Sequence, residues 1–579
     1  MNNILMSACL TLACLAPFAS IAATAAAPAD SDVFSTDQAN TIFEEFRAKD
    51  TPALAIALLK DGKLVYQQAF GQANLEYKVA ATVDTRFQID ALAWEFIAFA
   101  VLQLEDRGKI ALQDDIRKYL PDLPDLGKTI TIQHLLSSTD GLYGYRVMKS
   151  LAGWQPPQAA QYASALQLLK AQKAPNFTPG LAYSPGGDMR LVVLMRLVEA
   201  VSQQPFDLYS KEHIFAPLGM SGTAFVSDKS SVLNNVAVPY RDDGKGGYQP
   251  DHGDAVAAGP VVLYSSIKDL ATWRTKNGAG VAPRDALKTQ LDTPIRLDSG
   301  EMVKDISSIT NYAQQHNGKE RGIDKTYQTG NAGGYASSLF HFPGHGVTAI
   351  TLSSGLAYNG SYGMRAAGIL MEPHFTEPAT IDYAKVARAS LSTAQLQQHT
   401  GSYWSPERAL SARIILKDNV LYYARTGGTT QRTLIPLSDN VFQMQIEGDD
   451  KYLIEFLGAG KARQMHFSMS GSDPIVFEAH APTSYTAQEL AQFTGTFYSA
   501  ALNSSFVIKV SDGALAAHNL RTGVIHFKPV KPDIFVGDKS FMGGIQFSRS
   551  KGQGQGKPVT GFTVMVDEVR HLEFTRIDT

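Results

Sequence analysis

The cysteines and histidines of this 579-residue chain lack the spacing that thiol or metal chemistry requires. Both cysteines, Cys9 and Cys14, lie within the first 27 residues, so the rest of the chain has no thiol for a nucleophile, a disulfide or a metal. The 13 histidines form no His-Glu-x-x-His pattern, and no glycine-rich loop matches a P-loop or a dinucleotide fingerprint. We therefore expect no metal site and no cofactor.

Hydroxyl and carboxyl side chains follow His134 and raise the question of a serine nucleophile. His134 lies just inside the start of a helix pattern that Thr131 would cap. Residues 137–140, Ser-Ser-Thr-Asp, come after that helix, and a nucleophile among them would need a base that we cannot identify. We interpret His134 as part of the framework and residues 137–140 as a polar loop.

The composition is that of an ordinary folded protein, with 44% hydrophobic and 18% charged residues. Lysine and arginine number 52 against 55 aspartate and glutamate residues, a formal net charge of -3. This balance gives no electrostatic attraction to polyanions, so we expect no nucleic-acid partner. The length predicts several domains, because one hydrophobic core rarely organises so long a chain.

The first 27 residues predict a signal peptide. They carry no charged side chain, hold an apolar stretch from Ile4 to Ile21, and end in small residues such as Ala23-Thr24-Ala25. We expect an exported protein, periplasmic or secreted, with no membrane span in the mature chain. The alternative is an uncleaved anchor, because the segment lacks the usual lysine or arginine near its start.

The elements that follow alternate between helical and β-type patterns. Residues 35–46 predict a helix, and residues 53–59 and 64–70 are β-type runs joined by Asp61-Gly62, which suits a tight hairpin turn. The other expected elements are a buried central helix at 96–104, strands at 335–342 and 347–353, and a helix at 362–371.

Beyond about residue 385 the pattern changes to short alternating strands, and an internal repeat appears. Residues 400–403, Thr-Gly-Ser-Tyr, recur as Thr-Gly-Thr-Phe at 494–497, and residues 418–421 recur at 512–515. Both pairs are displaced by 94 residues, 494 less 400 and 512 less 418. A constant offset predicts two duplicated all-β modules, each a small barrel or sandwich. Their expected ranges are 386–481 and 482–579.

The segment Phe87–Leu142 resembles the serine β-lactamase and penicillin-binding-protein superfamily. It is similar to class C β-lactamases, D-alanyl-D-alanine carboxypeptidases and related esterases, in which an F-x-I-x-S-x-x-K block opens the buried helix and I-T-I-x-H-L-L follows. The resemblance covers about residues 35–375. It implies a mixed α/β domain at 28–385, an antiparallel sheet flanked by helices, followed by the two β-modules. Further matching segments are 176–180, 214–220 and 269–273.

The resemblance places Ala91 at the position of the family's serine and Trp94 at that of its lysine. The family's chemistry needs a serine at the start of the helix and a lysine one turn later to help take its proton. Alanine has no nucleophile, and an indole has no basic site near neutral pH. A tryptophan buries roughly 150–250 Å², so Trp94 would plug the former lysine pocket.

The second and third motifs are also altered. The second, normally a tyrosine and an asparagine after Pro-Gly, corresponds to residues 181–188, where the spacing does not align cleanly. Its Tyr183 is either a displaced partner of the base or a packing residue, and we favour the second. In the third motif a glutamine, Gln328, replaces the family's cation; it can hydrogen-bond a ligand amide or carboxylate but supplies no positive charge. The candidate ligand-binding residues are Tyr183, Ser184, Asp188, Gln328, Thr329 and Asn331.

These replacements predict an exported pseudoenzyme that binds a ligand or a protein partner in the cell envelope. Loss of the nucleophile in a cooperating catalytic unit costs on the order of 10⁶ in turnover. By resemblance, the ligand would be a D-amino-acyl peptide, a small amide or an ester. The alternative is an active hydrolase of the peptidase, esterase or β-lactamase type that uses non-standard residues, with Tyr183, Asp188 and Gln328 as participants. A third possibility is an adaptor protein whose cleft Trp94 fills.

Overall fold

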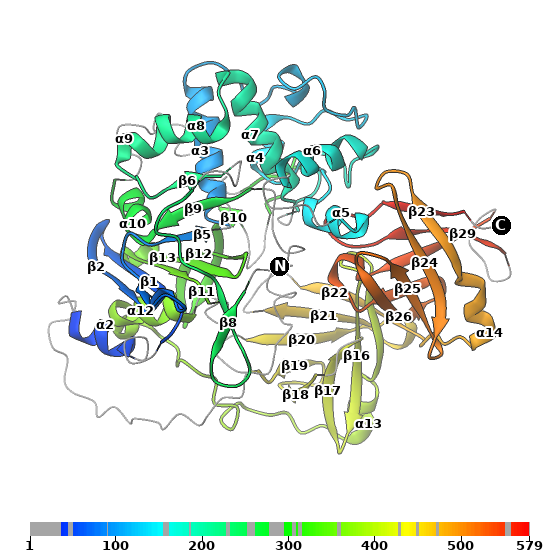
Figure 1. Cartoon of the computed structure of the whole chain (residues 1–579). Helices are drawn as coiled ribbons and strands as arrows, with labels where there is room; N and C mark the ends of the chain where they lie inside the picture. Colours follow the sequence, from blue (N-terminus) through cyan, green and yellow to red (C-terminus); the bar gives the residue numbers. More distant parts are fainter. Residues whose placement is uncertain are drawn as a thin grey trace.

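The computed structural model shows a mixed α/β domain followed by two closed β-barrels (Figure 1), which confirms the predicted fold class. The predicted signal peptide, residues 1–27, lies outside the described residues. The structure describes residues 36–44, 50–89, 91–154, 161–184, 187–226, 232–251, 261–276, 295–303, 309–310, 315–355, 361–426, 430–446, 451–469, 474–550 and 557–577.

A seven-stranded antiparallel sheet is the frame of the first domain. Its strands are β1 (Leu54–Lys60), β2 (Lys63–Phe70), β10 (Ile309–Thr310), β11 (Gln315–Glu320), β12 (Ile323–Ala332), β13 (Tyr335–Phe342) and β14 (Val347–Ser353). They are ordered β10-β11-β12-β13-β14-β1-β2 across the sheet. The β1–β2 hairpin turns at Asp61 and Gly62, whose φ angles of 51° and 73° are of the positive kind that this dipeptide favours. The strands predicted at 335–342 and 347–353 are confirmed as β13 and β14.

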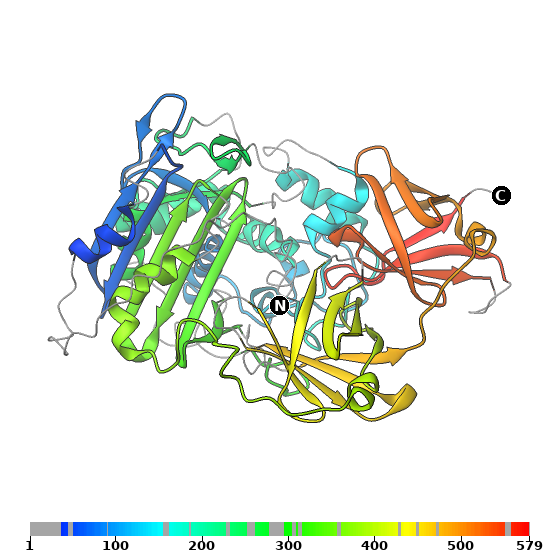
Figure 2. The ribbon, with the colours of Figure 1, turned by 90° about the horizontal axis from the view of Figure 1, so that it is seen from below.

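Helices cover both faces of this sheet (Figure 2). Alternate residues of β1 starting at Leu54 pack with α2 (Thr36–Ile42) and α12 (Ser361–Met371). The intervening residues starting at Ala55 belong to the core on the opposite face, where α10 (Ile267–Lys276) contacts β1, β2 and β14. Because side chains alternate along a strand, a run without polar residues is buried on both faces. The helix predicted at 362–371 is confirmed as α12.

The central helix predicted around 96–104 is α3 (Ala93–Asp106), which is buried from Phe96 to Leu104. It packs against α7 (Met189–Ser202) and, through Phe96 and Phe99, against Trp273 of α10, with ring centroids 4.9 and 5.0 Å apart. None of the helices in the described ranges has the length and apolarity needed to cross a membrane. The neighbouring helices are α4 (Ile132–Leu136), α5 (Tyr145–Ala152), α6 (Gln161–Ala171), α8 (Phe206–Ser210) and α9 (Ala216–Leu218).

A smaller three-stranded sheet connects the main sheet to α3. Its order is β5 (Arg86–Ile89), β9 (Leu263–Ser266) and β6 (Ala224–Phe225). Strand β5 contacts β12 and β13, so the end of β5 brings the start of α3 beside the main sheet. Two further hairpins pair β3 (Gln72–Asn74) with β4 (Val79–Ala80) and β7 (Tyr240–Asp242) with β8 (Tyr248–Pro250).

The C-terminal modules are two closed eight-stranded barrels, called here the first and the second barrel. The first contains β15 (Gly401–Ser405), β16 (Leu410–Lys417), β17 (Val420–Arg425), β18 (Gln431–Pro436), β19 (Val441–Met444), β20 (Tyr452–Leu457), β21 (Gln464–Met469) and β22 (Ile475–His480). The second contains β23 (Gly495–Ser499), β24 (Ser504–Ser511), β25 (Ala514–Asn519), β26 (Gly523–Lys531), β27 (Ile534–Gly537), β28 (Ile545–Arg549), β29 (Val559–Val564) and β30 (Glu573–Arg576). Short helices α13 (Thr393–Gln397) and α14 (Ala487–Leu490) precede them.

The repeated sequence landmarks occupy the same structural places in the two barrels. Gly401 and Gly495 begin β15 and β23 with φ angles of 146° and 141°. Asp418 and Asp512 begin the turns after β16 and β24 with φ angles of 51° and 52°. The repeat therefore marks positions that fix the backbone of each barrel.

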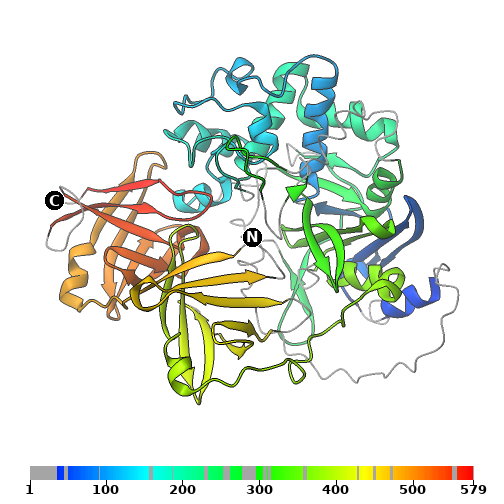
Figure 3. The ribbon, with the colours of Figure 1, turned by 180° about the vertical axis from the view of Figure 1, so that it is seen from behind.

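The second barrel packs directly on the first domain (Figures 1 and 3). Helix α5 contacts β24, and its buried residues Tyr145 and Met148 belong to the same hydrophobic core as Phe506 of the barrel. The first barrel has a core of its own. It meets the second through a small apolar seam in which Trp404 packs with Val530.

Candidate functional site

The start of α3 carries the two residues that stand at the family's serine and lysine positions. Ala91 lies just before the helix and is half-buried, and its carbonyl accepts a hydrogen bond from Trp94 N–H at 3.2 Å. Trp94 is half-buried and packs against the core of the domain. A methyl group thus stands at the nucleophile position, and an indole without a basic nitrogen stands at the base position.

Arg190, in the first turn of α7, packs on the face of Trp94. Its guanidinium carbon lies 4.7 Å from the Trp94 ring centroid, and the side chain is 1% exposed. It donates a hydrogen bond to the carbonyl of Gly187. Burial lowers the pKa of Arg190, and the acidic groups around it oppose that shift. A desolvated cation on an indole face contributes about 2 kcal/mol, so this stack holds Trp94 in place.

Two buried carboxyl groups, Asp140 and Asp188, accompany Arg190. Asp140 Oδ1 accepts a hydrogen bond from Leu142 N–H at 2.8 Å, and Asp188 Oδ1 accepts one from Tyr145 N–H at 2.6 Å. Burial raises the pKa of Asp140 to about 6, and the charge of Arg190 acts in the opposite direction. Asp188, a predicted ligand-binding residue, is 3% exposed and uses its carboxylate within the protein.

Residues 138–145, which we call the hub loop, hold these groups together. It includes the last three residues of the polar loop predicted at 137–140, whose four side chains are buried. The hub loop is hydrogen-bonded along its length to residues 172–188, which include the second motif. Ser138 O accepts from Ser184 N–H (2.9 Å), Thr139 O from Gly180 N–H (2.8 Å) and Gly141 O from Asn176 N–H (2.7 Å), while Tyr143 N–H donates to Gln172 Oε1 (3.1 Å).

The structure brings three residues of the second-motif region together. Tyr183 and Ser184 are half-buried, and Tyr183 interacts electrostatically with Arg190, as Asp188 does. Tyr183, Ser184 and Asp188 were predicted from the sequence, whereas Arg190 was not. An arginine within the otherwise apolar run Met189–Met195 was the available signal, since a buried helix face rarely holds a charge without partners.

The third-motif candidates lie on one strand but on two of its faces. Gln328 of β12 is 1% exposed and pairs with Leu339 of β13. Thr329 and Asn331 are exposed, and Gly330 between them is buried. Because successive side chains of a strand point to opposite faces, Thr329 and Asn331 share a face that Gln328 does not. A ligand contacted by Thr329 and Asn331 would therefore lie on the face of β12 opposite to the Gln328 side chain.

The turn between β12 and β13 lies close to β5. A Cβ atom added at Gly333 would lie 2.8 Å from Gln88 Oε1, so the buried Gln88 side chain reaches this turn closely. Gly333 has a φ of 59°. A larger residue there would both clash and adopt a left-handed conformation.

His134 has the framework role expected of it. Thr131 Oγ1 accepts a hydrogen bond from His134 N–H at 3.1 Å, and His134 Nδ1 accepts one from Thr131 N–H at 3.3 Å, which is a capping box at the start of α4. Its Nε2 lies 3.7 Å from Asp298 Oδ2. Burial lowers the pKa of His134, against the effect of Asp298.

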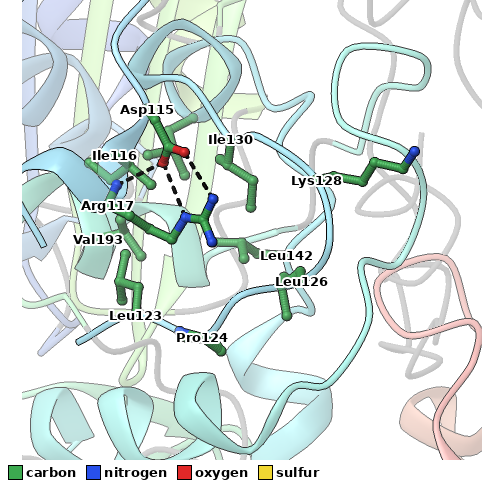
Figure 4. Close-up of a pocket in the computed structure, with 11 residues that line it drawn as sticks. Asp115, Ile116, Arg117, Leu123, Pro124, Leu126, Lys128, Ile130, Leu142 and Val193 are labelled. Atoms are coloured by element: carbon green, nitrogen blue, oxygen red, sulfur yellow. Dashed lines mark hydrogen bonds and ion pairs between the residues drawn. The ribbon is translucent and has the colours of Figure 1, made fainter. Parts of the chain in front are cut away.

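A cavity of about 20 Å³, enough for roughly one water molecule, is lined by residues between Asp115 and Leu135 together with Leu142 and Val193 (Figure 4). At its edge Arg117 forms an ion pair with Asp115 at 3.0 Å, and Lys128 points away from the other lining side chains. Its lining includes none of the residues at the family's catalytic positions. The apolar part of the lining is Ile116, Leu123, Pro124, Leu126, Ile130, Leu135, Leu142 and Val193.

Several known proteins are similar to this chain in sequence. D-aminopeptidase of Brucella anthropi is 29% identical over 250 residues, which are 43% of this chain and 47% of that protein. Penicillin-binding protein 4* of Bacillus subtilis is 24% identical over 453 residues, 75% of this chain and 96% of that protein. The matched part of this chain spans about half the length of the first curated relatives.

A solved structure shows the same fold. The octameric penicillin-binding protein homologue from Pyrococcus abyssi superposes with a TM-score of 0.51 at 19% identity, covering 76% of this chain and 99% of that one. The family model named Beta-lactamase matches residues 39–370, more than half of the sequence. On this match and the sheet, helices and motif positions described above, the chain belongs to the β-lactamase family.

Proposed function

We propose that this chain is a binding member of the β-lactamase family that lacks the family's serine acyl transfer. The observation that carries the proposal is the pair Ala91 and Trp94 at the serine and lysine positions. Trp94 is held there by the buried guanidinium of Arg190 at 4.7 Å. The framework around the altered positions is intact, which supports a retained binding role rather than general decay.

The ligand class that we propose is a small D-amino-acyl peptide, amide or ester. The names of the relatives, D-aminopeptidase and penicillin-binding protein, support this class. The uncharged, apolar first 27 residues support export to the cell envelope, where such peptides occur in the wall polymer. A protein partner that contacts the barrels is compatible with the same role.

A second candidate function is hydrolysis by water without a covalent intermediate. It is favoured by Asp140, a buried carboxyl group whose pKa is raised to about 6 and which interacts with Arg190. A general base is most effective when its pKa is close to the working pH. In this alternative Tyr183, Asp188 and Gln328 would orient the substrate and the water.

The test is an intact-mass experiment on the full chain. The protein is incubated with benzylpenicillin and with p-nitrophenyl acetate, and released product is monitored in the same samples. We expect no mass increase and no product above a heat-inactivated control. A stable acyl adduct on any residue would contradict the proposal. Product release that Asp140→Asn abolishes would support the second candidate function instead.

A double variant serves as the matched positive control. Ala91→Ser with Trp94→Lys restores both family side chains at the start of α3, and acylation of this variant alone would show that only the reactive groups are missing. For ligand binding, D-alanyl-D-alanine should raise the melting temperature by about 2 °C or more at saturation, and L-alanyl-L-alanine should not. Equal responses to both peptides, or no response, would contradict the proposed ligand class.

A further inference from the structure

One tight turn of the second barrel contacts the first domain beside the hub loop. The turn comprises residues 566–570 between β29 and β30. Val566 and Val569 exchange two backbone hydrogen bonds of 3.2 and 2.9 Å and are buried in the core shared with the first domain. Two arginines brace the turn: Arg408 Nη1 of the first barrel lies 3.2 Å from Asp567 Oδ2, and Arg570 Nη2 lies 3.0 Å from Asp567 Oδ1. The turn is therefore held by hydrogen bonds within it and by ion pairs on both sides of Asp567.

Asn176 of the first domain binds this turn with both ends of its carboxamide. Asn176 Nδ2 donates to Asp567 O at 2.8 Å, and Asn176 Oδ1 accepts from Arg570 N–H at 2.7 Å. A third bond runs from Gly144 N–H of the hub loop to Glu568 O at 3.0 Å. Asn176 is 1% exposed, so loss of either bond of its carboxamide would leave a buried polar group without a partner.

The other side of Asn176 continues into the candidate site. Its backbone N–H donates to Gly141 O, in the middle of the hub loop. The hub loop in turn accepts hydrogen bonds from Gly180 and Ser184, on both sides of Tyr183. A continuous chain of hydrogen bonds thus joins the turn of the second barrel to the second motif.

We infer that Asn176 is a positioning residue: its carboxamide couples the 566–570 turn of the second barrel to the hub loop and so holds the Gly180–Ser184 segment in place. The second barrel is then part of the support of the candidate site. The inference holds whether the site binds a ligand or turns one over, because it concerns the backbone that carries Tyr183.

Hydrogen–deuterium exchange on the full-length chain tests this inference without any ligand. In Asn176→Ala we expect the amides of Gly180 and Ser184, four and eight residues away, to exchange about tenfold faster or more, since their protection depends on the hub loop. Asn176→Asp keeps the acceptor for Arg570 N–H but sets a second acceptor oxygen against Asp567 O, so it should also speed exchange at the same amides. Amides of the first barrel should keep their wild-type rates.

Asn519 provides a matched control in the same barrel. Its Nδ2 donates to Ser505 O at 3.0 Å and its Oδ1 accepts from Arg521 N–H at 2.9 Å, and its hairpin lies against Gly153 at the end of α5. Asn519→Ala should leave the exchange of Gly180 and Ser184 unchanged. Faster exchange confined to residues 141–145 and 566–570 in Asn176→Ala would overturn the inference. Equal increases at Gly180 and Ser184 in both alanine variants would overturn it too, because they would show a general loosening of the barrel.

If Asn176→Ala does not fold, the same exchange measurement on Asn176→Asp and on a variant at Asp567 tests the inference. Asp567→Ala removes the brace from both arginines but leaves the Asn176 carboxamide and its backbone partners. We expect faster amide exchange at Gly144, which contacts the turn, and also at Ser184, which depends on the hub loop. Wild-type exchange at Ser184 with faster exchange at Gly144 would contradict the coupling.

Discussion

The two barrels share their strand order and repeated turns, but they differ in what equivalent side chains do. His399 of the first barrel precedes Thr400 as Phe493 of the second precedes Thr494. Trp404 on β15 fills the seam between the barrels, whereas Tyr498, its equivalent on β23, is half-buried and donates to Asn503 at 3.0 Å. The repeat has thus kept the residues that shape the backbone, while the side chains have diverged with each barrel's surroundings.

A buried ion pair distinguishes the second barrel most clearly. The side chains of Arg549 and Asp533 are 1% and 8% exposed and approach to 2.7 Å. In the first barrel Asn440 takes the place of Asp533: the carbonyl of Asn440 accepts from Phe456 N–H at 2.8 Å, as that of Asp533 accepts from Phe547 N–H at 2.8 Å. The two positions therefore make the same backbone hydrogen bond and differ only in the side chain.

The largest expected effect comes from breaking this ion pair. Asp533→Ala leaves a buried guanidinium without its partner and should lower the free energy of unfolding by about 3–5 kcal/mol. Asn440→Ala, the matched change in the first barrel, removes a carboxamide that donates to Phe456 O at 3.2 Å and should cost about 1 kcal/mol. Urea unfolding followed by circular dichroism measures both. Equal losses would show that the two positions have the same role.

The second-largest loss of stability is expected at the apolar seam between the barrels. Trp404 is 1% exposed, so Trp404→Ala should lower the free energy of unfolding by about 3 kcal/mol through lost burial and a cavity. Tyr498→Ala, on the equivalent strand, should cost less than about 1 kcal/mol because the ring is half-buried. Hydrogen exchange in β15 and β23 would report which barrel loosens. A larger loss for Tyr498→Ala would reverse our view of which barrel depends on the seam.

A buried histidine should make the stability of the first barrel depend on pH. Burial lowers the pKa of His399, and the nearby Arg463 acts in the same direction, whereas the hydrogen bond to Asp439 O opposes it. The folded barrel therefore favours the neutral ring, and its stability should fall as the pH drops below 6.5, the ordinary value.

His399→Phe, which introduces the residue of the second barrel, should reduce this dependence. It should change the stability at pH 7.5 by no more than about 1 kcal/mol, since it removes both a 2.8 Å bond to Asp439 O and a buried Nδ1 atom that has no partner within the described residues. Melting temperatures between pH 5 and 8 measure the slope. An unchanged slope in the variant would assign the pH dependence to another group.

The smallest effect is expected at the rim between the barrels. Lys531 Nζ lies 3.4 Å from Glu478 Oε2, and the two side chains are 28% and 51% exposed. Lys531→Ala should change stability by less than about 0.5 kcal/mol at physiological salt, because solvent screens such a pair. A loss above 1 kcal/mol would mean that polar contacts, and not the Trp404 seam, hold the barrels together.

Local patterns in the sequence predicted the elements whose signals are local. The Asp61-Gly62 turn, the bounds of β13 and β14, and the burial of α3 follow from alternation, apolar runs and positive-φ residues. The repeat at 400 and 494 predicted two small β-modules and left barrel or sandwich open, because closure depends on pairing between the first and last strands.

The candidate site was predicted less completely, because its key contacts join distant parts of the chain. The motif positions located Ala91, Trp94 and Tyr183, but the stacking of Arg190 on Trp94 joins residues almost 100 positions apart. The raised pKa of Asp140 follows from burial that no local pattern reveals. The alternation of side chains along a strand could have predicted that Gln328 lies on one face of the third-motif strand and Thr329 and Asn331 on the other.

Closure of both barrels determines where this protein can pair with another chain through its backbone. In a closed barrel every strand has two neighbours, so neither C-terminal module presents a free strand edge for sheet extension. The seven-stranded sheet is open and ends at β2 and β10. Within the part of the chain described here, strand addition to a large sheet is therefore restricted to the first domain, and assembly through the barrels would have to use side chains.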